Sequence, residues 1–469
     1  MYQDHFAAKC PDQGLGFPLI SLIPCFSRVE RIKQCIISES DVQVKSCKPF
    51  YRRRWCKLAT ILVEQGKKEL SPPAGKIPEV LFFIWSAILP FDNILKIGDF
   101  GTVTKYLGLI VVMAVIADRV VTGHGYIIKP SSGSIVWGFF ALLSVASLVW
   151  SASPGKSLNT LRTLVSLYGM YLVVSVTPWK EKSLDRLASY IIAGGVAAAI
   201  VSIYFFISGV TYLTTVRASL VIGEQRLADP NHFGTSLILP FIFSLHRYFR
   251  GAHHAFNLAE SGVILTAIVL TGSRGAVAGV ICAAFFLIWN DKRVKPIQLI
   301  FLATAVMVFL LFLDHIAPEQ LLMRYTFDSI LESQGSGRFG IWYFALEAFK
   351  KHPLIGWGYG TFSYLASGGI SANVTLPPSI GASPHNIYIQ ALTELGVLGF
   401  SLLLVALILH FRRALGLAKK NPFYIAVAAA LVGVAVSGFT LHILGDKYFW
   451  LLQMLCALSL ASPQYVYLE

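Results

Sequence analysis

The sequence predicts an all-α protein that crosses a membrane many times. Of its 469 residues, 55% are hydrophobic and 14% are charged, whereas a soluble domain carries about 25% charged residues. The mean hydropathy is +0.63. From residue 79 onward the chain repeats apolar runs of roughly 17 to 25 residues, each long enough to cross a hydrocarbon core of about 30 Å as a helix. We therefore expect a polytopic membrane domain over residues 79–461.

The apolar runs predict about twelve transmembrane helices. Their expected positions are 79–97, 102–117, 134–150, 158–176, 187–209, 233–248, 256–271, 274–290, 296–313, 386–410, 421–439 and 445–461. The count depends on how boundaries are drawn at two places. Pro90 and Asp92 interrupt the first run, and almost no loop separates the two runs around Ser273.

The connecting charges predict the orientation. Lysine and arginine gather in alternate loops, at 177–186, 246–250, 291–295 and 410–420, and basic loops tend to stay in the cytoplasm. Both termini then lie on that side, and the C-terminal tail is 462–469. Because topology accounts for much of the formal charge of +14, nucleic acid is not an expected partner.

Residues 1–78 are expected to form a cytoplasmic tail with little order and no chemistry. Five of the seven cysteines lie in this tail, at spacings that match no zinc or redox motif: Cys10, Cys25, Cys35, Cys47 and Cys56. A cytoplasmic location keeps such thiols reduced. The start of the chain also lacks the pattern of a cleavable signal peptide.

Three loops face outward in this topology: 210–232, the short turn at 271–274, and the long segment 314–384. Loops longer than about 15 residues are usually functional or disordered. Within the long one, 338–351 predicts an amphipathic helix, and the glycines and proline of 352–362 predict tight turns after it. We expect a structured external cap over the membrane domain.

Cationic residues gather in the loops that are predicted to face outward. The outward loops hold Arg217, Arg226, Arg274, Arg338, His352 and His385. An arginine beside a membrane span costs a few kcal/mol at mid-depth and usually faces a polar cavity. Snorkelling to the interface is the alternative for Arg274, but the glycines at 272 and 275 allow another group to approach its backbone, which favours a site.

The outward loop at 227–234 predicts the start of a helix. Asp229 suits the N-cap and Pro230 the first turn, so the positive end of the helix would face outward, where it favours phosphate. We expect Asp229 itself to have a capping role alone.

These residue types suit a diphosphate substrate. The planar guanidinium groups of Arg274 and Arg338 pair with phosphate oxygens bidentately and keep their charge, so they could stabilise a leaving diphosphate. His385 could take a proton from a hydroxyl nucleophile, although a lone histidine is often structural. The chain contains no P-loop, dinucleotide fingerprint, zinc helix or nucleophile elbow, which leaves a lipid-linked diphosphate as the expected donor.

Four sequence motifs resemble those of the O-antigen ligase superfamily, which includes polysaccharide polymerases. The motifs are GSRG at 272–275, SGRFGIW at 336–342, HPLIGWGYGTF at 352–362 and SPHNIYIQALTELGVLGF at 383–400. The resemblance covers 210–410 by motif and 79–461 by topology. It implies an inverting glycosyltransferase of the bacterial inner membrane that needs no metal or other cofactor and acts on the periplasmic side.

The resemblance also implies partners and site residues. The donor would be an undecaprenyl-diphosphate-linked glycan, and the acceptor either lipid A-core or another lipid-linked glycan, with membrane lipids around the protein. Arg274 and Arg338 would bind the donor diphosphate, and His385 would activate or orient the acceptor hydroxyl. The substrate-binding candidates are Arg217, Arg226, Asn231, His232, His352 and Asn386.

Three functions remain open at this stage. A lipid A-core acceptor makes the protein a ligase, which we take as the leading hypothesis, and a lipid-linked acceptor makes it a polymerase. A transporter of lipid-linked glycan is the third. The gathering of cations at the outer face disfavours it, because a translocation path needs polar groups across the depth of the bilayer, and no internal repeat is evident.

Overall fold

The computed structural model describes residues 73–92, 94–96, 101–122, 130–213, 216–222, 226–251, 253–326, 337–369 and 383–461. Most of the expected N-terminal tail, the C-terminal tail from residue 462, and the parts 327–336 and 370–382 of the expected cap lie outside the described residues.

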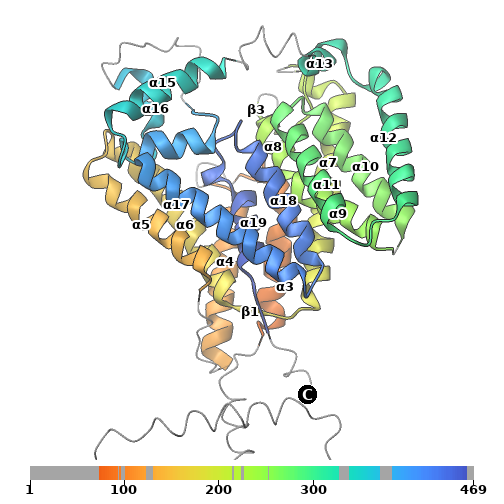
Figure 1. The fold of residues 1–469 in the computed structure, drawn as a ribbon, viewed down its shortest axis with the longest axis horizontal. Helices are drawn as coiled ribbons and strands as arrows, with labels where there is room; N and C mark the ends of the chain where they lie inside the picture. Colours follow the sequence, from red (N-terminus) through yellow and green to blue (C-terminus); the bar gives the residue numbers. More distant parts are fainter. Residues whose placement is uncertain are drawn as a thin grey trace, which may run out of the picture. The chain divides into compact units, whose positions relative to one another are not determined.

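The described residues are mainly helical (Figure 1). The elements up to residue 227 are α3 (Lys76–Ile88), η1 (Leu89–Phe91), α4 (Val103–Thr122), α5 (Ser132–Ala146), η3 (Ser147–Val149), α6 (Pro154–Val176), β1 (Pro178–Trp179), α7 (Ser183–Ile207), η4 (Val210–Leu213), β2 (Val221–Ile222) and β3 (Arg226–Leu227). The later elements are α8 (Pro230–Ser236), α9 (Ile238–Arg250), α10 (His254–Leu270), α11 (Arg274–Asn290), α12 (Pro296–Ile316), α13 (Glu319–Leu322), η5 (Met323–Tyr325), α15 (Arg338–Lys351), α16 (Phe362–Tyr364), η6 (Leu365–Gly369), α17 (Ile387–Ala418), α18 (Phe423–Ser437), η7 (Ile443–Gly445), α19 (Lys447–Ala457) and β4 (Ser459–Leu460).

Every predicted span contains a helix, but the helices differ in length. In the described part of the chain, four are long and apolar enough to cross a membrane, over 132–149, 183–207, 296–313 and 387–418. The 11 residues of α19 reach only about 16 Å, and this helix is buried among the others. The protein is therefore a helical multi-pass membrane protein, and the number of about twelve crossings stays a prediction.

Prolines end two helices earlier than the hydropathy predicts. The first expected span stops at Ile88, and Pro90 lies in the 3₁₀ turn that follows. The expected span 233–248 is divided at Leu237 into α8 and α9, and Pro240 lies in the first turn of α9. Proline has no backbone N–H, so it is tolerated near the start of a helix but not in its interior.

Small residues allow the closest helix packing. A Cβ at Gly279 of α11 would lie 2.5 Å from the carbonyl oxygen of Gly433 in α18, and a Cβ at Gly433 would lie 2.7 Å from that of Gly279. The two backbones therefore touch, as is common where membrane helices meet through small residues. In the other part of the bundle, large aromatic side chains fill the core, among them Trp137, Tyr171 and Trp450.

The predicted turns after α15 are confirmed. Gly356, Gly358 and Gly360 all have positive φ, which glycine adopts without steric cost. Gly396 breaks α17 at φ 65°, and the turn packs into this break, with the N–H of Gly358 donating to the carbonyl of Glu394 at 2.8 Å. The external segment is thereby attached to a membrane helix.

The two ends of the bundle carry different elements. Figure 1 shows α8, α13, α15 and α16 at one end, while the pair β1–β4 lies toward the other. The elements that hold the predicted site residues meet at the first of these ends.

Candidate functional site

Four half-buried arginines gather around the turn between α10 and α11. Arg217 donates from Nε to the carbonyl of Thr271 at 2.6 Å, and Arg274 donates from Nε to the carbonyl of Arg324 at 2.5 Å. Arg324 in turn donates from Nε to the carbonyl of Gly272 at 3.3 Å. The fourth, Arg338, is close enough for the charges of Arg274 and Arg324 to lower its pKa, although burial is the larger cause. We call Arg217, Arg274, Arg324 and Arg338 the arginine cluster.

Glycines at 272 and 275 make this packing possible, as the sequence predicts. Gly272 has φ +61°, and a Cβ there would lie 2.8 Å from the side chain of Leu321 and 3.1 Å from Nε of Arg324. A Cβ at Gly275 would collide with Thr440, from the loop after α18. A side chain at either position would push the outer segments away from the α10–α11 turn.

Helix N-termini add positive potential to the cluster. α11 begins at Arg274 and α15 at Arg338, and α8 begins next to Asn231, whose Oδ1 accepts from Arg217 at 2.7 Å. Unpaired N–H groups and the helix dipole make such ends favourable for anions. The predicted cap is confirmed, because Asp229 Oδ1 accepts from the N–H of Asn231 at 2.7 Å.

The arginines of the cluster lie close enough to lower one another's pKa. Burial, with Arg324 as the next cause, lowers the pKa of Arg217 to about 10. Asp229 opposes this shift and also favours the charged form of Arg338. A nearby anion favours the charged form of half-buried cations that repel one another, so the cluster can bind a group with several negative charges.

His385 lies beside the arginine cluster, just before α17. Its φ of 45° is unusual for a residue other than glycine, which is typical of strained positions at functional sites. Its pKa is lowered, first by burial and then by Arg338. Nδ1 is buried without a hydrogen-bond partner among the described residues. An imidazole that is neutral near pH 7 can accept a proton.

Two further histidines, His442 and His232, lie in a row with His385. The ring of His442 lies 5.6 Å from that of His385 and 5.1 Å from that of His232, in edge-to-face geometry each time. His442 Nδ1 and Ser383 Oγ are 2.8 Å apart, and burial together with His232 lowers the pKa of His442 to about 4. Burial opposes the charged form of His232 as well, but its 2.7 Å contact with Asp446 raises its pKa to about 9.

The structure thus brings most of the sequence-predicted residues together. One region is surrounded by six of them: Arg217, Asn231, His232, Arg274, Arg338 and His385. Asn386 adjoins it as the N-cap of α17, accepting from the N–H groups of Tyr388 and Ile389.

Two predicted residues differ from this group. The backbone of Arg226 lies in β3, and its side chain lies outside the described residues. His352 is exposed and packs against Trp357, with ring centroids 4.1 Å apart. Arg338 and His352 mark the opposite ends of α15, which separates them by roughly 20 Å at 1.5 Å per residue. The structure does not bring His352 to the cluster.

The sequence does not predict a role for Arg324, His442 or Asp446. Arg324 lies in the segment 314–384 with the predicted Arg338 and His352, and His442 lies in the loop 440–444, which the same topology predicts to face outward. Topology could therefore have indicated these two, whereas Asp446 lies inside the predicted span 445–461. In the part of the chain that the structure describes, no set of three His, Cys, Asp or Glu side chains is arranged to hold a metal ion.

Comparisons with known proteins agree with the motifs. The family model described as O-antigen ligase matches residues 261–404, which include Arg274, Arg324, Arg338 and His385. The exopolysaccharide production protein ExoQ of Rhizobium meliloti (strain 1021) is 26% identical over 370 residues, covering 74% of this chain and 78% of that protein. The predicted resemblance to the O-antigen ligase-like superfamily is confirmed.

Proposed function

We propose that this O-antigen ligase-like protein is a membrane glycosyltransferase that takes a glycan from an undecaprenyl-diphosphate-linked donor. The observation that carries the proposal is the arginine cluster, in which four arginines and two long-helix N-termini converge. A diphosphate offers oxygens for several bidentate arginine contacts at once.

The proposed reaction is a single displacement. The acceptor hydroxyl oxygen forms a bond to the anomeric carbon while the bond from that carbon to the diphosphate oxygen breaks, so the configuration inverts. Arg274 and Arg338 stabilise the negative charge that develops on the diphosphate, and Arg217 and Arg324 complete its binding. His385 takes the hydroxyl proton, and no metal ion enters this scheme.

The neighbouring histidines support this role for His385. Burial and Arg338 lower the pKa of His385, and the positive charge of His232, which Asp446 favours, adds to this shift. His385 therefore stays neutral and ready to accept a proton over the physiological range of pH.

The leading acceptor is lipid A-core, which makes the protein a ligase. A polymerase that joins lipid-linked glycans is the second candidate, and the similarity to a protein named for exopolysaccharide production favours it. A strain that lacks this protein distinguishes the two. Accumulated lipid-linked polymer with unmodified lipid A-core supports the ligase, whereas accumulated single repeats support the polymerase.

The active side is proposed to be periplasmic, with the protein in the bacterial inner membrane. Single cysteines introduced at exposed positions such as Tyr343 in α15 should react with a membrane-impermeant maleimide added to intact spheroplasts. A cysteine at Arg412, at the other end of α17, is the matched control and should stay protected. The reverse labelling pattern contradicts the proposed orientation.

Binding and transfer can be tested separately with purified protein. Lipid-linked donor should bind to wild type and to His385→Ala, while transfer to an acceptor should be lost in the variant. If wild-type protein binds and moves the donor across vesicles without glycosyl transfer, the transporter alternative replaces the proposal.

A further inference from the structure

A second polar site lies at the opposite end of the same helices. A cavity of about 700 Å³ opens between the end of α9, the starts of α7, α10 and α18, and the loop after α17. The arginine cluster lies at the other ends of α10 and α11. Because α10 has 17 residues, the two sites are separated by roughly 25 Å along its axis, which is close to the thickness of a hydrocarbon core, about 30 Å.

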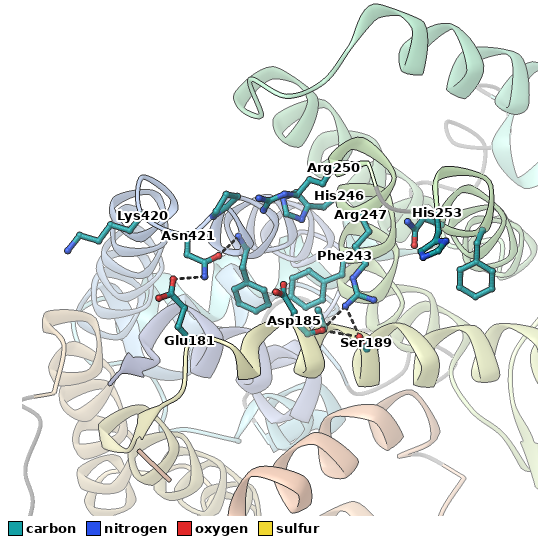
Figure 2. A pocket seen from close by; sticks show the side chains of 15 residues that line it. Glu181, Asp185, Ser189, Phe243, His246, Arg247, Arg250, His253, Lys420 and Asn421 are labelled. Atoms are coloured by element: carbon teal, nitrogen blue, oxygen red, sulfur yellow. Dashed lines mark hydrogen bonds between the residues drawn. The ribbon is translucent and has the colours of Figure 1, made fainter. Parts of the chain in front are cut away.

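Aromatic side chains form the inner wall of this cavity. Figure 2 shows Phe243 at its centre, and the ring of Phe423 lies 5.1 Å from that of Phe243. Both are buried, whereas Phe256 on α10 is 65% exposed at the edge of the cavity. The apolar lining therefore continues to the outer surface of a membrane helix, where acyl chains would lie.

Both signs of charge line the rim. Arg247, Arg250 and Lys420 supply positive charge, and Glu181 and Asp185 supply negative charge. Arg247 is fixed by its NH2 group, which donates to the carbonyl of Asp185 at 2.6 Å and to Ser189 Oγ at 2.7 Å (Figure 2). Glu181 is the acceptor for the side-chain amide of Asn421 at 2.9 Å. This mixture differs from the arginine cluster.

Behind the rim, two facing side-chain atoms of His246 and Asp291 lack a hydrogen-bond partner among the described residues. His246 lines the cavity and is 6% exposed. Its Nε2 lies 3.6 Å from Oδ2 of Asp291, too far for a hydrogen bond, and neither atom has another partner among the described residues. A buried polar atom without a partner is costly, so a bound group that supplies one would be favoured here.

We propose that this cavity binds the head group of a zwitterionic phospholipid of the phosphatidylethanolamine type. The phosphate lies against Arg250 and His246, and the ammonium group lies against Glu181 and Asp185. The acyl chains leave past Phe256. Three features require this class: an anion site, a cation site within the same cavity, and an apolar exit to the membrane. A phosphate group alone would add a negative charge beside Glu181 and Asp185 and bring no cation to them.

The test is lipid retention by the full-length protein in vesicles that contain equal parts of phosphatidylethanolamine, phosphatidylcholine and phosphatidylglycerol. After extraction into mild detergent, native mass spectrometry should detect one retained phosphatidylethanolamine. Arg250→Ala should reduce retention at least roughly tenfold, the loss of about one charge-assisted contact. Arg412→Ala, an exposed arginine outside the cavity, is the matched control and should retain the lipid.

A second variant tests the zwitterionic assignment without removing packing. Glu181→Gln with Asp185→Asn keeps the side-chain size and should shift retention from phosphatidylethanolamine toward phosphatidylglycerol. Equal retention in wild type and Arg250→Ala, or a preference of the wild type for phosphatidylglycerol, overturns the proposal. Displacement of the lipid by millimolar inorganic phosphate also overturns it, because the apolar exit would then contribute nothing. Donor binding at the other end reports separately on the proposed glycosyltransferase.

Discussion

The two ends of the helical bundle hold their charges in different ways. At the arginine cluster, four arginines approach one another through backbone carbonyls and helix N-termini. At the cavity around Phe243, arginine and lysine alternate with glutamate and aspartate over an aromatic wall. The first arrangement stores repulsion that an anion relieves, and the second is close to balanced.

This difference supports the proposal that the arginine cluster, and not the cavity, is where the reaction takes place. Repulsion among buried cations is useful where negative charge develops during a reaction, because it is relieved most in the transition state. A balanced rim gains nothing from such a change and suits a ligand that only binds. His385 lies beside the arginine cluster, whereas His246 of the cavity lining faces the carboxylate of Asp291.

The largest effect is expected at His385. His385→Ala should reduce transfer by roughly 10² to 10⁴-fold, the usual range for loss of a general base, with donor binding unchanged. His385→Gln keeps polar contacts but cannot take a proton, so it should be nearly as inactive. Initial rates with purified donor and acceptor measure both variants. Substantial activity in His385→Gln indicates that the residue orients the acceptor and that the proton leaves by another route.

Local sequence signals predicted the parts of this end that depend on neighbouring residues. The N-cap at Asp229, the start of α15 at Arg338 and the glycines at 272 and 275 were all expected from short patterns. Contacts between segments that are far apart in the sequence were not predicted. Arg324 reaches the carbonyl of Gly272 across 52 positions, and only the folded arrangement shows it.

The folded arrangement also decides the positions of His352 and of the cavity. His352 shares the segment 314–384 with Arg338, but the length of α15, a helix that the sequence predicts over 338–351, separates them. The cavity at the other end joins residues from 181 to 423. In the sequence these charges indicated topology alone, since no pattern shows that loops far apart in the chain enclose a common space.

The next largest effect is expected at Arg338. Lysine keeps the charge but loses the planar pair of donors, so Arg338→Lys should weaken donor use by roughly 10- to 100-fold, as for loss of a charge-assisted hydrogen bond. Arg338→Ala should be weaker still. Arg412→Lys is the matched control, with wild-type rates. Wild-type kcat/KM in both Arg338 variants removes this residue from donor binding.

A smaller effect is expected in the pH profile. Burial and Arg338 lower the pKa of His385 below its ordinary value of about 6.5, so the base stays neutral at pH 7 and activity should fall only as the pH drops below that value. Arg338→Ala removes one cause of the shift and should move this limb to higher pH. Rates between pH 5 and 8 measure it. A limb that stays in place in Arg338→Ala indicates that another group titrates.

The smallest expected effect concerns stability and the pair His232–Asp446. The folded pKa of His232 is about 9, above its unfolded value of about 6.5. The folded state therefore binds this proton more tightly, so its contribution is complete below pH 6.5 and is lost as the pH rises through about 9. The amount is on the order of 1–3 kcal/mol, a shift of a few degrees in Tm.

Asp446→Asn removes the charge that raises the pKa of His232, so thermal unfolding of the detergent-purified variant should depend less on pH across this window than that of wild type. His315→Gln, a histidine of α12 distant in sequence from this pair, is the control and should follow wild type. If Asp446→Asn and wild type lose Tm in parallel between pH 6.5 and 9, His232 is not held protonated, and burial and Arg338 keep His385 neutral without it.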